Sequence, residues 1–271
     1  MGVAKSSRSV FPKVLITIVV ILLVLLLVAE FGLRWFIGRE LKNEFSEQVA
    51  QQGITVEEDP TISFGSSPLL LGLAQGSIKH VAVDTPDTIK ITHPGDGSSV
   101  PEISGTPQAT VVLTGLSIAD LNNPVADHLD LTTFVSDEFI LATVQAEMAK
   151  ASQEQGDGLA ARLMQELVKI TGIRSNTDTQ AIEVEFTDGA ARANLRPLVL
   201  NGQLAFEVLD SQLLGFDLPE EISKALTDGI QSQVNEVAGS LQISSIDVTE
   251  GGLDINLTGE NINVRTLESV G

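Results

Sequence analysis

The sequence predicts an α+β protein in which a curved antiparallel sheet wraps around amphipathic helices, with one N-terminal transmembrane helix in front. Three observations support this fold class. An unbroken apolar run lies close to the N-terminus, several segments alternate apolar with polar residues, and others repeat apolar residues at helical spacing. Because short turn sequences join neighbouring alternating segments, their strands are expected to pair antiparallel.

The apolar run extends from Val14 to Ala29, and Thr17 is its only polar member. As a helix it is about 24 Å long at ~1.5 Å per residue, somewhat short of a hydrocarbon core of about 30 Å. The next residues, up to Phe36, include the only tryptophan of the chain, and tryptophan is enriched at membrane interfaces. We therefore predict a transmembrane signal-anchor helix at residues 14–36.

Basic residues on the N-terminal side set the orientation of this helix. Lys5, Arg8 and Lys13 precede the run, and such residues stay on the cytoplasmic side of a membrane. We expect residues 1–13 to be a cytoplasmic segment of a single-pass cell-membrane protein, and residues 37–271 to form an extracytoplasmic domain on the periplasmic side. A cleaved signal peptide is the alternative, but the run exceeds the usual ~15 residues and lacks a good small-residue cleavage site.

Helical spacing recurs after the apolar run. The predicted helices span residues 37–53, a short stretch from Ile118, and residues 137–150, 159–170 and 222–237. Pro219 and the two glutamates after it favour a helix start just before the last of these. Residues 84–107 hold four of the ten prolines, which predicts a long mobile loop.

Alternation of apolar and polar residues predicts the strands. Two lie within residues 61–83, on either side of an apolar connection, and the others at 110–114, 182–186, 191–195, 198–208, 241–249 and 253–257. Asp188-Gly189 and Gly251-Gly252 are hairpin signals, and the segment 198–208 is either one longer strand or two strands that turn at Asn201-Gly202. One face of each strand is apolar, as in a sheet with one face on a core.

Charge is distributed unevenly along the chain. The net charge is −20, yet six of the 16 basic residues and only two of the 36 acidic residues lie at or before Lys42. A body this acidic repels polyanions and offers no basic stripe, so we expect no nucleic-acid partner. The absence of cysteine excludes disulfides and thiolate metal sites. We expect no metal and no cofactor, because the carboxylates and the three histidines show no ligand spacing.

Few residues suit catalysis. Gly115-x-Ser117-x-Ala119 is one residue away from the nucleophile elbow of an esterase. Ser117 is more simply explained as a helix cap, and neither the acid nor the histidine of a triad can be assigned. We therefore predict that the protein is not an enzyme.

The least polar stretch after the N-terminal run is Pro68-Leu-Leu-Leu-Gly-Leu73. It is too short to span a bilayer and too continuous for a half-buried strand. Three interpretations remain open: a wall or mouth of an apolar pocket, a tip that touches the membrane, or an ordinary core strand.

Four segments resemble an actinobacterial family of membrane-anchored proteins, the family that includes the mycobacterial lipid-binding protein LmeA. They are Ser63–Val83, Val111-Val-Leu-Thr-Gly-Leu116, Gly215-Phe-Asp-Leu-Pro219 and Ile246–Gly259, within a resemblance that extends from about Leu41 to Val264. It implies a cell-envelope domain that binds phospholipid, a fold similar to tubular lipid-binding proteins, and a role in maintaining mannan-bearing glycolipids. It implies no catalytic residues. Leu69 and Leu71 stand where family members have aromatic residues, and residues 84–107 form a longer segment here.

We therefore expect a carrier or sensor that holds the acyl chains of a phospholipid in an apolar groove between sheet and helices. The expected lipid-binding residues are Leu69, Leu70, Leu71 and Leu73 at the mouth, and Leu200, Leu204, Phe206, Ile222, Leu226 and Ile230 along the wall. Because an acidic body repels anionic headgroups, either the tails dominate binding or a basic patch near Arg192 and Arg196 receives the headgroup. The alternative function is a scaffold that binds no lipid and grips an envelope-assembly enzyme.

Overall fold

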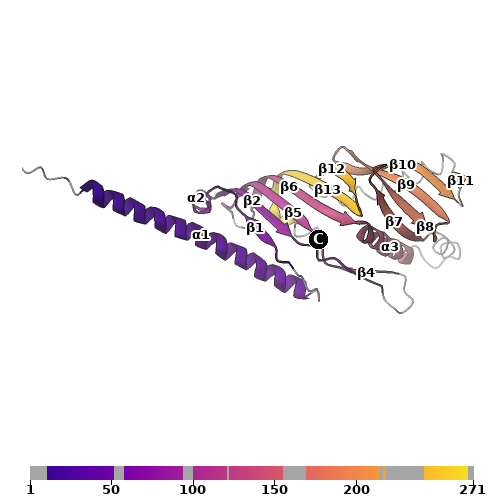
Figure 1. Ribbon diagram of the computed structural model, residues 1–271, viewed down its shortest axis with the longest axis horizontal. Coiled ribbons are helices and arrows are strands. Elements are labelled where there is room, and N and C mark those ends of the chain that lie inside the picture. The colour runs from indigo at the N-terminus through magenta and orange to yellow at the C-terminus, as the bar shows by residue number, and fades with distance from the viewer. Residues whose placement is uncertain are drawn as a thin grey trace, which may run out of the picture.

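The protein is an elongated α+β molecule with two main antiparallel sheets (Figure 1). The computed structural model describes residues 11–51, 58–93, 100–120, 122–154, 169–213, 216–217 and 241–267. Antiparallel strands dominate, helices are few, and an apolar helix comes first. The predicted fold class is confirmed.

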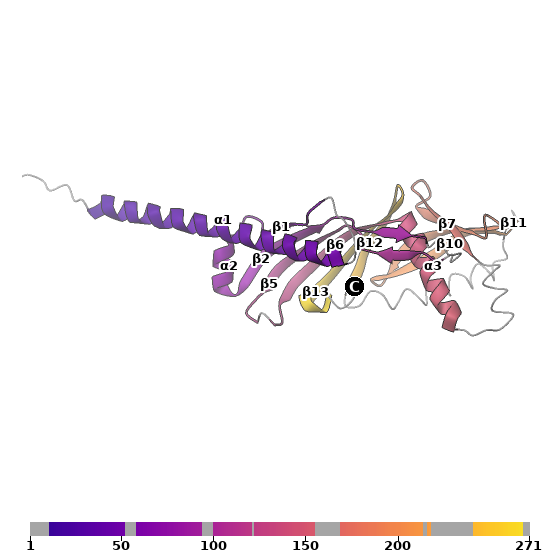
Figure 2. The same ribbon diagram turned by 90° about the horizontal axis from the view of Figure 1, so that it is seen from below.

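The first helix, α1 (Phe11–Gln51), is continuous from the apolar run to the domain, as the four-residue spacing predicts. Its N-terminal half projects beyond the rest of the molecule (Figure 2), and the side chains of residues 20–28 are exposed. Farther along, Leu33 and Ile37 pack against the core of the domain. From Val20 to Glu47 this helix is long and apolar enough to cross a membrane, and Leu33 and Ile37 within that span also belong to the fold.

The larger sheet has six strands in the order β1-β2-β5-β6-β13-β12. These are β1 (Thr61–Ser63), β2 (Ser77–Thr85), β5 (Ala109–Ser117), β6 (Val125–Ser136), β13 (Gly252–Asn263) and β12 (Gln242–Thr249). Every neighbouring pair is antiparallel. The sheet therefore joins the first part of the domain to the last hairpin of the chain.

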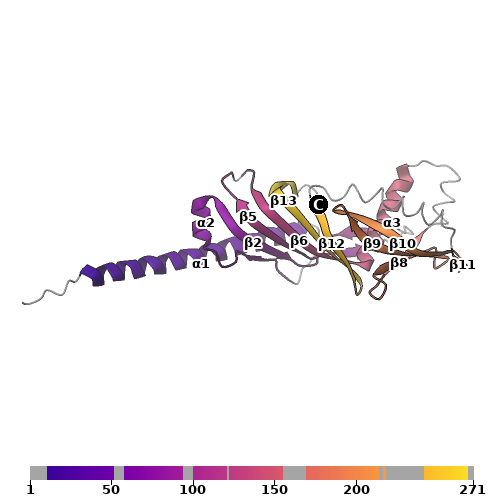
Figure 3. The ribbon, with the colours of Figure 1, turned by 90° about the horizontal axis from the view of Figure 1, so that it is seen from above.

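The second sheet has five strands in the order β11-β10-β9-β8-β7 and lies at the end of the molecule opposite α2 (Figure 3). These are β7 (Ile170–Asn176), β8 (Ala181–Phe186), β9 (Ala191–Leu200), β10 (Gln203–Leu213) and β11 (Phe216–Asp217). The predicted turn at Asp188-Gly189 is confirmed, as is the alternative with a turn at Asn201-Gly202, because β8, β9 and β10 pair as successive hairpins.

Three shorter helices complete the described chain: α2 (Leu69–Gln75), α3 (Asp137–Glu154) and α6 (Val264–Leu267). The helix α3 begins where predicted, and Ser136 caps it by accepting a hydrogen bond from the Phe139 N–H at 3.2 Å. The helix α2 ends at Gly76, whose left-handed backbone (φ +70°) is typical of a helix C-cap.

Several predicted elements differ from the structure or lie outside the described residues. The helix expected from Ile118 is wrong, because β5 continues to Ser117 and the Ile118 N–H donates to the Gly76 carbonyl at 2.9 Å. The strands β6 and β7 were not predicted. Most of the helix predicted at 159–170 lies outside the described residues, as does the one at 222–237.

The segment expected to be a long loop, residues 84–107, is partly built of strands. It begins with the end of β2 and contains a two-stranded ribbon of β3 (Lys90–Thr92) and β4 (Glu102–Ser104). Thr88 and Thr106 flank the ribbon in sequence, and the buried Thr88 accepts a hydrogen bond at its hydroxyl from the Thr106 N–H at 2.9 Å. The mobility of this segment stays a prediction.

Two apolar cores divide the domain. The anchor-side core lies on the six-stranded sheet beside α1 and α2, and consists of Phe64, Leu69, Val81, Leu113, Ala126, Leu129 and Ile262. The distal core lies between the second sheet, the β12–β13 hairpin and α3, and consists of Ile173, Ile182, Val184, Ala193, Leu195, Val248 and Leu253. Because β13 contributes to both, the two cores share one strand.

The six-stranded sheet bends where its ladder is interrupted. Gly115, Asp127 and Asn261 are skipped in the pairing of β5, β6 and β13, and both Gly115 (φ +65°) and Asn261 (φ +53°) have left-handed backbones. A side chain at residue 115 would overlap the Asp127 carboxylate, so glycine is needed there. The bend lets Ala126 and Leu129 face the same core although they lie three residues apart in one strand.

Candidate lipid-binding surface

A row of six apolar side chains crosses one face of the larger sheet, one from each strand. The strand register pairs them in the order Ile62, Val83, Val111, Leu131, Leu257 and Ile243. All six are only half-buried. We call this set the apolar row. At ~4.8 Å between strands it is about 24 Å long, and one leaflet of a hydrocarbon core is about 15 Å thick. The row is therefore long enough to contact one extended acyl chain.

The adjacent row on the same face closes the core. Val81, Leu113 and Leu129 pair directly and are buried, and Leu129 has no exposed surface. The apolar row thus lies directly beside the packed anchor-side core. On its other side, Ile255 and Leu253 of β13 continue the same face to the distal core. Along β13 this face is apolar from one core to the other.

The opposite face of the sheet is polar. Asp84 accepts hydrogen bonds from Thr61 and Thr110 at 3.1 and 2.7 Å, and Thr132 donates to Asn256 at 2.7 Å. A cavity of about 350 Å³ on this face has carboxylates from Glu58, Asp59, Asp84 and Asp254 among its lining residues. Such a lining suits water rather than acyl chains, so the lipid-binding candidate is the apolar face.

His128 lies on the polar face beside two carboxylates. Its Nδ1 atom is 2.9 Å from Glu260 Oε1, and its Nε2 atom is 3.1 Å from Asp130 Oδ1. The hydrogen bond with Glu260, helped by Asp130, raises the pKa of His128. Within the part of the chain that the structure describes, no group of three or more potential ligands could hold a metal ion.

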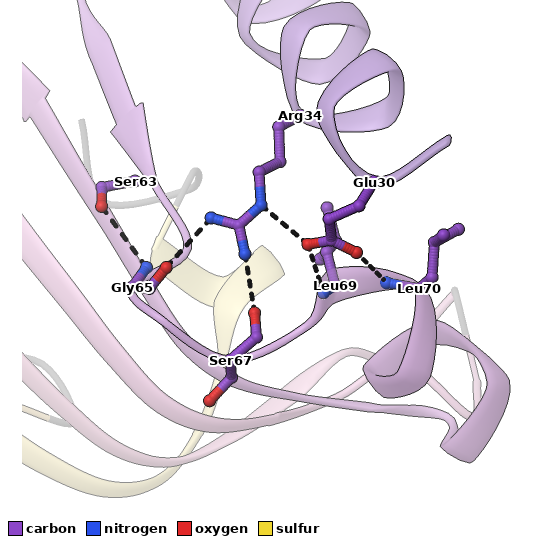
Figure 4. A network of polar contacts seen from close by, with 7 residues as sticks. All are labelled: Glu30, Arg34, Ser63, Gly65, Ser67, Leu69 and Leu70. Carbon is purple, nitrogen blue, oxygen red and sulfur yellow. Dashed lines mark hydrogen bonds and ion pairs between the residues drawn. The ribbon is translucent and has the colours of Figure 1, made fainter. Parts of the chain in front are cut away.

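A polar clamp, Glu30 with Arg34, joins α1 to α2 (Figure 4). The two oxygens of the Glu30 carboxylate accept hydrogen bonds from the N–H groups of Leu69 and Leu70 at 2.7 and 2.9 Å. Since α2 follows Pro68 and has no side-chain cap of its own, Glu30 supplies that cap from a distant part of the chain.

Arg34 completes the clamp. Its Nε atom donates to Glu30 at 2.7 Å, and its two terminal nitrogens donate to the carbonyls of Gly65 and Ser67 at 3.0 and 2.7 Å. The guanidinium also lies over the ring of Phe64, 5.9 Å from the ring centre. The clamp therefore fixes both α2 and the loop before it against the anchor helix.

A comparison with models of protein families matches residues 28–258 to the LmeA-like phospholipid-binding family. The chain belongs to this family. Neither the curated proteins nor the solved structures that were searched contain a match. The matched range includes the clamp, α2 and the whole apolar row, so this LmeA-like chain has both features inside the family's region.

The structure places the four predicted mouth residues of this LmeA-like chain on α2. The core-strand interpretation is wrong, because residues 69–75 form a helix. Leu69 is 1% exposed and belongs to the anchor-side core, Leu70 is half-buried, and Leu71 and Leu73 are 54% and 39% exposed. Only part of this leucine cluster is therefore available to a ligand or a membrane.

The predicted wall residues lie elsewhere. Leu200 is exposed at the end of β9, Leu204 is half-buried on β10, and Phe206 packs against the distal core. They belong to the second sheet, so the structure does not bring them next to the leucines of α2 (Figure 3). Ile222, Leu226 and Ile230 lie outside the described residues and stay a prediction.

The basic patch considered for the headgroup is neutralised by neighbouring carboxylates. Arg192 lies 3.5 Å from Glu185, and Arg196 lies 3.3 Å from Glu207. These pairs favour the alternative in which the acyl tails dominate binding. The helix-cap explanation of Ser117 is wrong, because Ser117 pairs with Ser77 and Val125 inside a sheet and no helix follows in residues 118–120. The alternative of a nucleophile elbow lacks its strand-to-helix context for the same reason.

Sequence reasoning missed the apolar row and the clamp. Leu129 and Leu131 alternate with polar residues, so the signal for β6 was present. Glu30 and Arg34 stand four apart at the end of the apolar run, a spacing that places them together on a helix. Their partners on α2 could not be found this way, because they lie 39 and 40 residues from Glu30.

Proposed function

We propose that this chain is a membrane-anchored, extracytoplasmic phospholipid carrier or sensor in which the apolar row contacts the acyl chains. The family supports phospholipid as the ligand. The single observation that supports this site is the row itself, six half-buried apolar side chains in register across every strand of the sheet. Support for cell-envelope lipid or lipoglycan maintenance comes from the resemblance to the family alone.

Burial of methylenes supplies the affinity. Each acyl methylene removed from water contributes about 0.8 kcal/mol, so about a dozen contribute roughly 10 kcal/mol. That is comparable to the cost of association, which is of the order of 4–15 kcal/mol. An anionic headgroup gains little electrostatic attraction from an acidic body whose Arg192 and Arg196 are already paired with carboxylates. The headgroup therefore contributes orientation rather than affinity.

The membrane anchor is the N-terminal part of α1. Its side chains from Val20 to Val28 are exposed, and the helix from Val20 to Glu47 is long and apolar enough to cross a membrane. Lys5, Arg8 and Lys13 favour an N-terminus in the cytoplasm and a domain on the periplasmic side.

The test is native mass spectrometry of the full chain in detergent, with lipid extraction of the same sample. We expect one phospholipid bound per chain. Val111→Trp places a large ring in the apolar row and should reduce the bound phospholipid at least about tenfold, since a filled site loses most of the burial. Val112→Trp is the matched control, because Val112 is the next residue of β5 and faces the other side of the sheet.

Two outcomes contradict the proposal. A wild-type chain that carries no phospholipid, and takes up none when it is added, would leave the scaffold as the better explanation. Equal loss in both tryptophan variants, with folding shown by circular dichroism, would move the site away from the apolar row.

The predicted leucines extend the same test. Leu70→Asp and Leu226→Asp should each abolish lipid co-purification if mouth and wall belong to one groove. Substitution of Leu200, Leu204 or Phe206 by Asp asks whether the lipid reaches the second sheet. Retained lipid in a folded variant removes that residue from the proposed site.

A further inference from the structure

The segment around α2 is an uncharged tip on an acidic protein. No ionisable residue lies between Phe64 and Lys79, whereas the chain as a whole has a net charge of −20. Leu71 and Leu73 of this segment expose half and over a third of their surface. Exposed leucines without nearby charge are typical of a surface that meets an apolar partner.

Both charges of the clamp are paired. The oxygens of Glu30 accept from two backbone N–H groups and from Arg34, while three nitrogens of Arg34 donate to Glu30, Gly65 and Ser67. Ionisable groups close to lipid are found paired in this way, because an unpaired charge there is costly. The clamp is thus compatible with a position at the edge of the hydrocarbon.

Two features of α1 give the depth of α2. Glu30, which holds α2, comes directly after the apolar run that ends at Ala29. On another side of the helix Trp35 is exposed, and Arg39 lies over its ring at 5.4 Å, an arrangement typical of the membrane interface. Glu30 and Trp35 are about 7.5 Å apart along the helix at ~1.5 Å per residue. The tip therefore lies on the hydrocarbon side of the tryptophan.

We propose that α2 docks into the outer leaflet of the membrane that holds α1, with Leu71 and Leu73 among the lipids and the Glu30–Arg34 clamp as the positioning element. The proposal rests on the membrane anchor of the proposed function and adds the route of the ligand. Because Leu69 packs in the anchor-side core while Leu71 faces outward, α2 stands between the bilayer and the sheet. Phospholipid is therefore exchanged with the anchoring membrane itself.

The lack of cysteine makes a direct depth measurement simple. Leu71→Cys in the full chain is labelled with the fluorophore NBD and reconstituted in nanodiscs of phosphatidylcholine and phosphatidylglycerol. The control is Thr177→Cys, in the exposed turn between β7 and β8 of the second sheet. Nitroxide-labelled phosphatidylcholine should quench the label at 71 at least about twofold and leave the label at 177 unchanged, because quenching needs contact with the acyl region. Equal quenching at both positions, or none at 71, overturns the docking.

The clamp is tested by one matched pair of charge removals on α1. Arg34→Gln removes the ion pair with Glu30, whereas Arg39→Gln removes the same charge five residues later, at a side chain that lies over Trp35. We expect nitroxide quenching at Leu71→Cys to fall by about half or more in Arg34→Gln and to stay unchanged in Arg39→Gln, since only the first removes the bonds that fix the loop before α2 against α1. Equal quenching of the label at residue 71 in Arg34→Gln and Arg39→Gln overturns the positioning role of the clamp.

Failure of this inference differs from failure of the proposed function. Bound phospholipid in native mass spectra with no quenching at Leu71→Cys would overturn the docking and leave the lipid site. Strong quenching with no bound phospholipid would support the docking of α2 and contradict the proposed lipid site.

Discussion

The anchor-side core and the distal core are built differently although they share β13. Two helices from the N-terminal part of the chain border the first core, and the Glu30–Arg34 clamp holds them. The second core is sheet against sheet, with Ile140 and Leu141 of α3 packed at its side. Among the described residues, the side chains of the anchor helix pack against the first core and not against the second. A perturbation near the membrane should therefore weaken one core more than the other, and the following variants test this.

The largest effect is expected from Leu129→Ala, which empties a fully buried site of the anchor-side core. The variant should cost about 3 kcal/mol, or roughly 100-fold in the local opening equilibrium. Hydrogen exchange by mass spectrometry should show lost protection in β2 and β5 more than in β8 and β9. Leu195→Ala in the distal core is the matched control and should show the reverse. Equal loss in both sheets would mean that the two cores unfold as one unit.

Gly115→Ala should come next, at about 1–3 kcal/mol, because the residue has a left-handed backbone and the new methyl group overlaps the Asp127 carboxylate. Gly251→Ala separates the two causes, since Gly251 (φ +77°) has a similar backbone and open space around it. The thermal midpoint of the full chain in detergent gives the comparison. If both variants lose the same amount, backbone strain alone accounts for the effect and the overlap with Asp127 contributes nothing.

Asp137→Ala probes the distal side. Its carboxylate accepts hydrogen bonds from the Ser175 N–H and hydroxyl at 2.8 and 2.6 Å and so ties α3 to β7. Loss of these bonds should cost about 1–2 kcal/mol, measured as faster hydrogen exchange in β7. Glu138→Ala removes the neighbouring charge of the same helix turn and should change little. Similar effects of the two variants would point to the helix charge rather than to Ser175.

The smallest effect concerns pH. Because Glu260 and Asp130 raise the pKa of His128 in the folded protein, its charge stabilises the fold below its ordinary value of about 6.5. That stabilisation is lost as the pH rises through the raised pKa. Thermal midpoints of wild type and His128→Gln should therefore differ in mildly acidic buffer and converge in alkaline buffer. A difference that grows with pH would contradict this assignment.

Local patterns predicted much of the fold. The hairpins β8–β9, β9–β10 and β12–β13 followed from alternation and from glycine-containing turns, and α1 and α3 from apolar spacing. The strand β6 was missed although Leu129 and Leu131 alternate with polar residues.

The rest depends on contacts between distant residues. A short leucine run fits a strand or a helix equally well, and α2 forms where Glu30 of α1 caps it and Gly76 ends it. The apolar row depends on the register of six strands, and β12 and β13 come more than a hundred residues after β5 in the chain. No window along the sequence contains that information.

Each strand contributes a single side chain to the apolar row. At the proposed site, an acyl chain would meet one side chain from each of the six strands in turn. A substitution of one row residue would therefore change the shape of the proposed site at one strand, without a change of fold.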